Sequence, residues 1–130
     1  MHMPHDLQML TWSAALAIVQ MLIAVLAAIS AVGLPMLVGN REGLPAYTGW
    51  VLRSQRAHIN MLESLVIFAI FVIVAQLAGR ANAMTALGTT LFFWGRVAYV
   101  IVYLAGIPWV RTLVWAVSLV GILLVGSQLF

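Results

Sequence analysis

Four apolar segments, each long enough to cross a lipid bilayer as a helix, constrain this chain more than any other feature. A spanning helix needs about 20 predominantly apolar residues, and the segments cover roughly 10–38, 51–78, 84–105 and 109–130. Hydrophobic residues make up 65% of the 130 residues and charged residues 7%. A water-soluble domain of this length cannot bury so much apolar surface. We therefore expect a single domain, 1–130, folded as an all-α, membrane-embedded four-helix bundle.

Short connections with turn-forming residues separate the segments, at 39–45, 79–82 and 106–108. Four spans leave both termini on one side. Basic residues in short loops are retained in the cytoplasm, and arginines gather around the first and third connections, whereas Arg80 alone lies at the second. We predict that the first and third connections are cytoplasmic and that both termini are outside.

The first segment carries two features of its own. The residues before it lack the positive charge of a secretory signal, so we expect it to be retained as a helix. Gly33 and Pro35 either kink its last turns or stop it. Its small residues Ala24, Ala27, Ala28 and Ala31 recur at spacings that allow close helix packing in lipid, although alanine is common in any membrane helix.

Composition also excludes several kinds of chemistry. The six basic residues are all arginine and lie beside or inside apolar spans, which is not the exposed basic surface of a nucleic-acid-binding protein. Without cysteine, the chain has no disulfide and no thiolate. We predict no metal site, because His58 has no partner at ligand spacing and His2 and His5 lie at the far terminus. Any sulfur chemistry must come from a ligand.

Two polar stripes interrupt the apolar pattern. On the second segment, residues spaced by 3, 4 and 3 share an arc of about 80°: Arg53, Arg56, Asn60 and Glu63. On the third segment, the same spacing aligns Arg96, Tyr99 and Tyr103. Because one segment begins and the other ends at the same face, the stripes lie at similar depth, level with Arg41 and Arg111. The topology therefore predicts one site with contributions from all four helices.

Charges at this depth must be paired, since an arginine at a helix centre costs about 2.5–3.5 kcal/mol on insertion scales. Glu63 and Arg96 lie deepest, and we predict an ion pair between them. The other arginines form a cationic cluster that needs an anion, reinforced by the positive end of the second helix. The simpler alternative is that these arginines only contact lipid headgroups, but this leaves Asn60, Tyr99 and Tyr103 unexplained.

The run from Arg53 to Glu63 resembles the second-helix signature of the MAPEG family, the membrane-associated proteins in eicosanoid and glutathione metabolism. The stretches Arg96 to Tyr99, Tyr103 to Pro108, and Arg111-Thr112 resemble its third- and fourth-helix signatures. The hydropathy layout matches along essentially the whole chain. The resemblance implies a homotrimer that binds glutathione between subunits near the cytoplasmic face and acts on lipophilic small molecules as a transferase or peroxidase.

The resemblance also implies residue roles. The glutathione contacts would be Arg53, Asn60, Glu63, Tyr99 and Tyr103, with Arg41 reaching in from an adjacent subunit, Arg56 and Arg96 matching further family arginines, and Thr112 as a second candidate contact for the sulfur. Arg111 matches the arginine that faces the glutathione sulfur, where it would be the catalytic residue by stabilising the thiolate.

Two departures from the family pattern bear on function. Ile59 stands where some eicosanoid-forming members have a further arginine, so one carboxylate contact is missing. The interval from Pro108 to Arg111 is one residue longer than in one branch of the family. The alternatives are a non-catalytic trimeric membrane protein whose basic pocket binds anionic lipid or another anion, and a small drug exporter, which the arginines around Glu63 disfavour.

Overall fold

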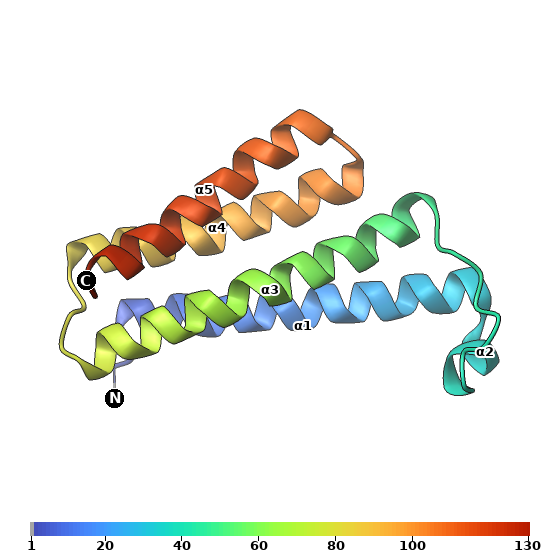
Figure 1. Cartoon of the computed structure of the whole chain (residues 1–130), viewed down its shortest axis with the longest axis horizontal. Coiled ribbons are helices and arrows are strands. Elements are labelled where there is room, and N and C mark those ends of the chain that lie inside the picture. Colours follow the sequence, from blue (N-terminus) through green and yellow to red (C-terminus); the bar gives the residue numbers. More distant parts are fainter. Residues whose placement is uncertain (1) are drawn as a thin grey trace.

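The computed structural model describes residues 2–130, and every regular element among them is helical. The helices are α1 (His5–Val32), α2 (Leu34–Val38), α3 (Gly49–Leu77), α4 (Ala83–Ala105) and α5 (Pro108–Ser127). All except α2 are long and apolar enough to cross a membrane. The predicted all-α bundle with four spans is confirmed, and Figure 1 shows these helices running side by side.

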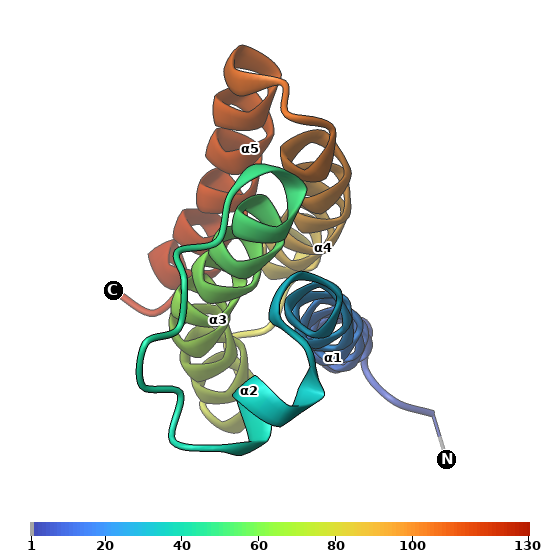
Figure 2. The same cartoon turned by 90° about the vertical axis from the view of Figure 1, so that its right-hand side faces the viewer.

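The prediction of one continuous first helix over 10–38 is wrong. α1 begins earlier, at His5, and ends at Val32, because Gly33 adopts the left-handed φ of 84° and donates its N–H to the Ile29 carbonyl. Pro35 has no N–H to continue the helix ladder. The chain then turns into α2, which crosses the end of the bundle in Figure 2. Gly33 and Pro35 therefore stop the helix rather than kink it.

The helices pack through small side chains and stacked aromatic rings. α4 and α5 approach so closely that a Cβ on Gly121 would lie 2.5 Å from the Gly88 carbonyl oxygen. Between α3 and α4, the Phe68 and Phe92 rings stack with centroids 3.9 Å apart. On α1, the small residues Ala24, Ala27 and Ala28 are buried, whereas Ala31 is exposed. The predicted packing role is confirmed for the three buried alanines.

The two ends of the bundle differ in what they hold. Both termini and the α3–α4 connection lie at one end, and the α1–α3 and α4–α5 connections lie at the other (Figure 1). The first and third predicted connections therefore share one end of the bundle, and the side of the membrane on which each end lies stays a prediction. The outer surface is strongly apolar, with Leu26 64% and Leu113 67% exposed, which suits a lipid environment.

Candidate functional site

The polar stripes meet at the end of the bundle that holds the α4–α5 connection. A cavity of about 260 Å³ lies there, lined by Asn60 of α3, Tyr99 and Tyr103 of α4, and Arg111, Thr112 and Trp115 of α5. Helical spacing explains the convergence, because residues three or four apart share a face. Pro108 starts α5 directly after the connection, which brings Arg111 to the level of the last turn of α4.

Two further cavities adjoin the first. One, of about 220 Å³, shares Asn60, Tyr99 and Tyr103 with it and adds Arg56, Ile59 and Glu63. The other, of about 230 Å³, runs deeper between α3 and α5 along Ile67, Trp115, Leu119 and Ile122, with Asn60, Glu63, Ser64 and Ser118. The site is therefore polar near the end of the bundle and largely apolar farther in. This arrangement suits a polar ligand beside an apolar one.

Arg96 is the buried centre of this region, with no exposed surface. Its Nη1 donates to the Asn60 side-chain oxygen at 2.8 Å, and its Cζ lies 4.1 Å from the centroid of the Tyr99 ring. Its Nε and Nη2 atoms have no hydrogen-bond partner among residues 2–130. Arg96 lines none of the three cavities, so it acts on the site through Asn60.

The predicted ion pair between Glu63 and Arg96 is wrong for this chain. Asn60 occupies the position facing Arg96, and the Glu63 side chain is exposed. Three residues turn a helix by about 300°, so Glu63 points about 60° away from Asn60. That rotation carries the carboxylate to the outer side of the stripe, where it lines the second cavity.

Arg111 presents a cation to the first cavity. Its Cζ lies 4.8 Å from the centroid of the Tyr103 ring, which in turn meets the Tyr99 ring edge to face at 5.4 Å. Thr112 donates its hydroxyl hydrogen to the Pro108 carbonyl at 3.4 Å. None of the residues that line this cavity is acidic. Arg111 therefore faces a cavity that itself supplies no counter-charge.

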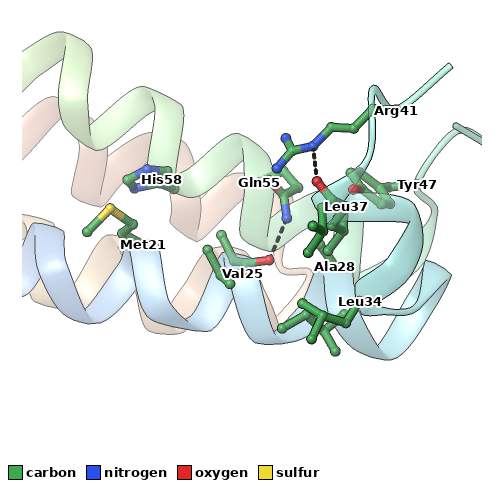
Figure 3. A pocket seen from close by; sticks show the side chains of 12 residues that line it. Met21, Val25, Ala28, Leu34, Leu37, Arg41, Tyr47, Gln55 and His58 are labelled. Atoms are coloured by element: carbon green, nitrogen blue, oxygen red, sulfur yellow. Dashed lines mark hydrogen bonds between the residues drawn. The ribbon is translucent and has the colours of Figure 1, made fainter.

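The remaining predicted arginines lie apart from the first cavity. Arg53 donates its Nε hydrogen to the Leu104 carbonyl at 3.3 Å, which satisfies an end carbonyl of α4. Arg56 is exposed beside the second cavity. Arg41 donates to the Leu37 carbonyl at 2.9 Å and lines a separate cavity between α1, α2 and α3 (Figure 3). The prediction that all four spans contribute to one site is therefore wrong within a single chain, since the first span provides none of its lining.

Sequence reasoning missed Trp115, which lines both the first and the third cavity. Its signal was present, because Trp115 follows Arg111 by four residues and so shares its face of the helix. It also missed a largely apolar cavity lined in part by His58, whose Nδ1 atom is buried without a hydrogen-bond partner in the described part of the chain. That histidine lies on a different face of α3 from the stripe.

A search of protein-family models matches residues 9–130 to the MAPEG family. The chain belongs to the MAPEG family. The match covers nearly the whole bundle, including α3, α4 and α5 with the cavities between them. No curated protein and no solved structure matched the chain. Membership agrees with the two motifs seen in the sequence, and the MAPEG family includes both glutathione-dependent enzymes and non-catalytic members.

Proposed function

We propose that this MAPEG protein binds glutathione and uses its thiolate to conjugate lipophilic electrophiles, to reduce lipophilic hydroperoxides, or both. The observation that carries the proposal is the first cavity, where Arg111 stands beside two tyrosines with no acidic lining residue. A cation in a partly dehydrated site lowers the pKa of a nearby thiol, which is about 8.5 in a free cysteine. Arg111 thereby favours the reactive form at neutral pH.

The cavities offer groups for each part of glutathione, which has two carboxylates, an ammonium group and a thiol. Arg56 is suited to a carboxylate, and Glu63 is suited to the ammonium group. The Tyr99 and Tyr103 hydroxyls add hydrogen-bonding capacity beside the thiol. Asn60 holds Arg96 in place. The further predicted contacts, from Arg53 and Thr112, belong to the same proposal.

The reaction needs only the thiolate and an electrophile dissolved in the bilayer. In conjugation, the sulfur forms a bond to carbon, the leaving group departs with the electron pair, and the thiol proton passes to solvent. In peroxide reduction, the thiolate attacks the terminal oxygen of the O–O bond to form a sulfenic acid, and the alkoxide leaves with the electron pair and takes a proton from solvent to give the alcohol. A second glutathione then reacts with the sulfenic acid to yield the disulfide and water. The protein supplies proximity and charge stabilisation in either case.

The assembly we propose is a homotrimer with the site between subunits and its open end in the cytoplasm. Arg56, Ile59 and Glu63 are exposed on one face of α3, and a carboxylate within a membrane span is costly when it faces lipid. A second copy covering this face removes that cost. It also allows Arg41, which is distant from the first cavity in its own chain, to reach the site of a neighbour.

Thermal stabilisation by glutathione is the first test. A ligand present at 100 times its dissociation constant adds about 2.7 kcal/mol to stability, so millimolar glutathione should raise the melting temperature of the purified protein. Ophthalmate, which replaces the thiol with a methyl group, is the control for binding without sulfur. No shift with either compound contradicts glutathione binding. A shift without conjugation of an aryl halide or reduction of cumene hydroperoxide favours a non-catalytic member.

A further inference from the structure

The Arg53 side chain contacts the connection between α4 and α5, although Arg53 lines none of the three cavities of the site. Its Nε atom donates to the Leu104 carbonyl at 3.3 Å. A Cβ added to Gly106 would lie 3.6 Å from both the Nε and the Cζ atoms of Arg53, so the guanidinium also lies beside this glycine. The second turn of α3 therefore touches the connection at two points.

The Leu104 carbonyl needs a donor from outside α4. In a helix the bonding N–H comes from four residues later, and that residue is Pro108, which has no N–H. The N–H groups of Gly106 and Ile107 already donate to earlier carbonyls of α4, at 3.0 Å and 3.2 Å, and close the helix as a Schellman motif. Arg53 supplies the donor that the connection itself lacks.

The connection also places two side chains that line the first cavity. Tyr103 directly precedes Leu104, and Arg111 lies in the first turn of α5, where its backbone N–H donates to the Ile107 carbonyl at 3.3 Å. The Arg111 Cζ atom lies 4.8 Å from the centroid of the Tyr103 ring. This separation depends on the course of the chain between the two residues, which is the segment that Arg53 contacts.

We propose that Arg53 is a positioning residue, which fixes the α4–α5 connection from α3 and so holds Arg111 beside Tyr103 where the glutathione sulfur is to bind. This inference rests on the proposed function. The direct glutathione contact predicted for Arg53 is the competing role. Positioning needs the Nε donor at the Leu104 carbonyl, whereas a contact with a glutathione carboxylate needs the positive charge.

Arg53→Gln and Arg53→Met separate these two roles. The glutamine Nε2 atom is as many bonds from Cα as the arginine Nε, so glutamine keeps a donor without the charge, and methionine has a similar length without a donor. We expect Arg53→Met to lower kcat for aryl halide conjugation about tenfold, because misplaced groups are costly in catalysis. Its kcat profile should also move to higher pH, since a displaced Arg111 lowers the thiol pKa less. The KM for glutathione should change little, and Arg53→Gln should restore most of kcat.

Amide hydrogen exchange of the unliganded protein in detergent gives a readout that does not depend on catalysis. The N–H groups of residues 106–111 should exchange about tenfold faster in Arg53→Met than in the wild type, and near the wild-type rate in Arg53→Gln. Arg80→Met is the matched control, because Arg80 also donates to a carbonyl just beyond a helix, that of Gln128 at 3.3 Å, at the other end of the bundle. It should leave exchange in 106–111 unchanged.

Two results would overturn the proposal. One is unchanged exchange in Arg53→Met, which counts against it whether or not the protein is an enzyme. The other is a raised KM for glutathione in both Arg53 variants with an unchanged pH profile, which assigns Arg53 to the ligand. A wild-type protein that does not conjugate the aryl halide would instead contradict the proposed activity, and the exchange rates would still show whether Arg53 fixes the connection.

Discussion

The two ends of the bundle differ in whether their polar side chains find hydrogen-bond partners within the chain. At the end with the termini, Asn82 caps α4 by accepting from the backbone N–H groups of Met84 and Thr85, and its amide donates to the Gln128 side-chain oxygen at 2.8 Å. The buried Asp6 accepts from the Thr89 hydroxyl at 3.4 Å. The chain satisfies these groups by itself.

At the end with the α4–α5 connection, several polar groups lack partners among the described residues. Two nitrogens of the fully buried Arg96 have no hydrogen-bond partner among residues 2–130. Arg111 faces a cavity without acidic lining residues, and Glu63 is exposed on a membrane-spanning helix. The unpaired buried nitrogens of Arg96 reduce stability. We propose that the first end stabilises the fold and that the second gives up stability for ligand binding. Substitutions at the two ends should therefore separate stability from binding.

The largest expected effect is on catalysis by Arg111→Ala. Loss of a group that stabilises charge in a transition state typically lowers kcat by about 10² to 10³-fold. We expect a loss of this size in aryl halide conjugation, with a smaller change in glutathione affinity. Steady-state kinetics at saturating glutathione measures it, and Arg80→Ala is the control. Unchanged turnover in Arg111→Ala would remove this residue from the mechanism.

Arg96→Met should lower the affinity for glutathione without a comparable loss of folding stability. Arg96 holds the Asn60 side chain, which lines all three cavities. Hydrogen bonds to charged groups contribute about 1.5–3 kcal/mol, so loss of this contact should lower glutathione affinity by about 10- to 150-fold. Replacing a buried charge with an apolar side chain is often neutral or stabilising for the free protein. Calorimetric titration and thermal unfolding of the same samples measure both quantities. A strongly destabilised apoprotein with normal affinity would reverse the assignment.

Gly121→Ala tests the close contact of α4 and α5, which supports both ends. The added Cβ would lie 2.5 Å from the Gly88 oxygen and 2.7 Å from the Phe92 nitrogen, so the helices must separate. Overpacking of this kind costs about 1–3 kcal/mol. Denaturant unfolding in detergent gives the loss, and Leu123→Ala, at an exposed position of α5, serves as the reference. Equal stability of the two variants would show that the helices are not tightly packed.

The smallest expected effect is on stability, at the end of the bundle that holds the termini. Asn82→Ala removes the capping box of α4, and loss of an N-cap costs about 1 kcal/mol. The melting temperature should fall, whereas glutathione affinity should stay the same. Asn82→Asp retains an acceptor oxygen for the backbone and should restore most of the stability. A loss of glutathione affinity in Asn82→Ala would show that the two ends are coupled.

Sequence reasoning went furthest where a single helix carried the information. Hydropathy predicted the four spans, and the 3 and 4 spacings predicted that Tyr99 and Tyr103 share a face. Contacts between helices were harder to predict. Spacing shows that the polar residues of the second segment share an arc of about 80°, but it does not show which of them contacts a neighbouring helix. Asn60 therefore took the place at Arg96 that was predicted for Glu63. Arg41 lies apart from the first cavity of its own chain because Gly33 ends α1 and redirects the chain through α2.

Ionisation of bound glutathione tests the central claim most directly. The ultraviolet absorbance of a thiolate is recorded while the purified protein is titrated with glutathione at neutral pH, and ophthalmate provides the blank. The account predicts a saturable thiolate signal in the wild type and, at concentrations that still saturate the site, its loss in Arg111→Ala. Bound glutathione that stays protonated in the wild type, or a thiolate signal that persists in Arg111→Ala, would contradict it.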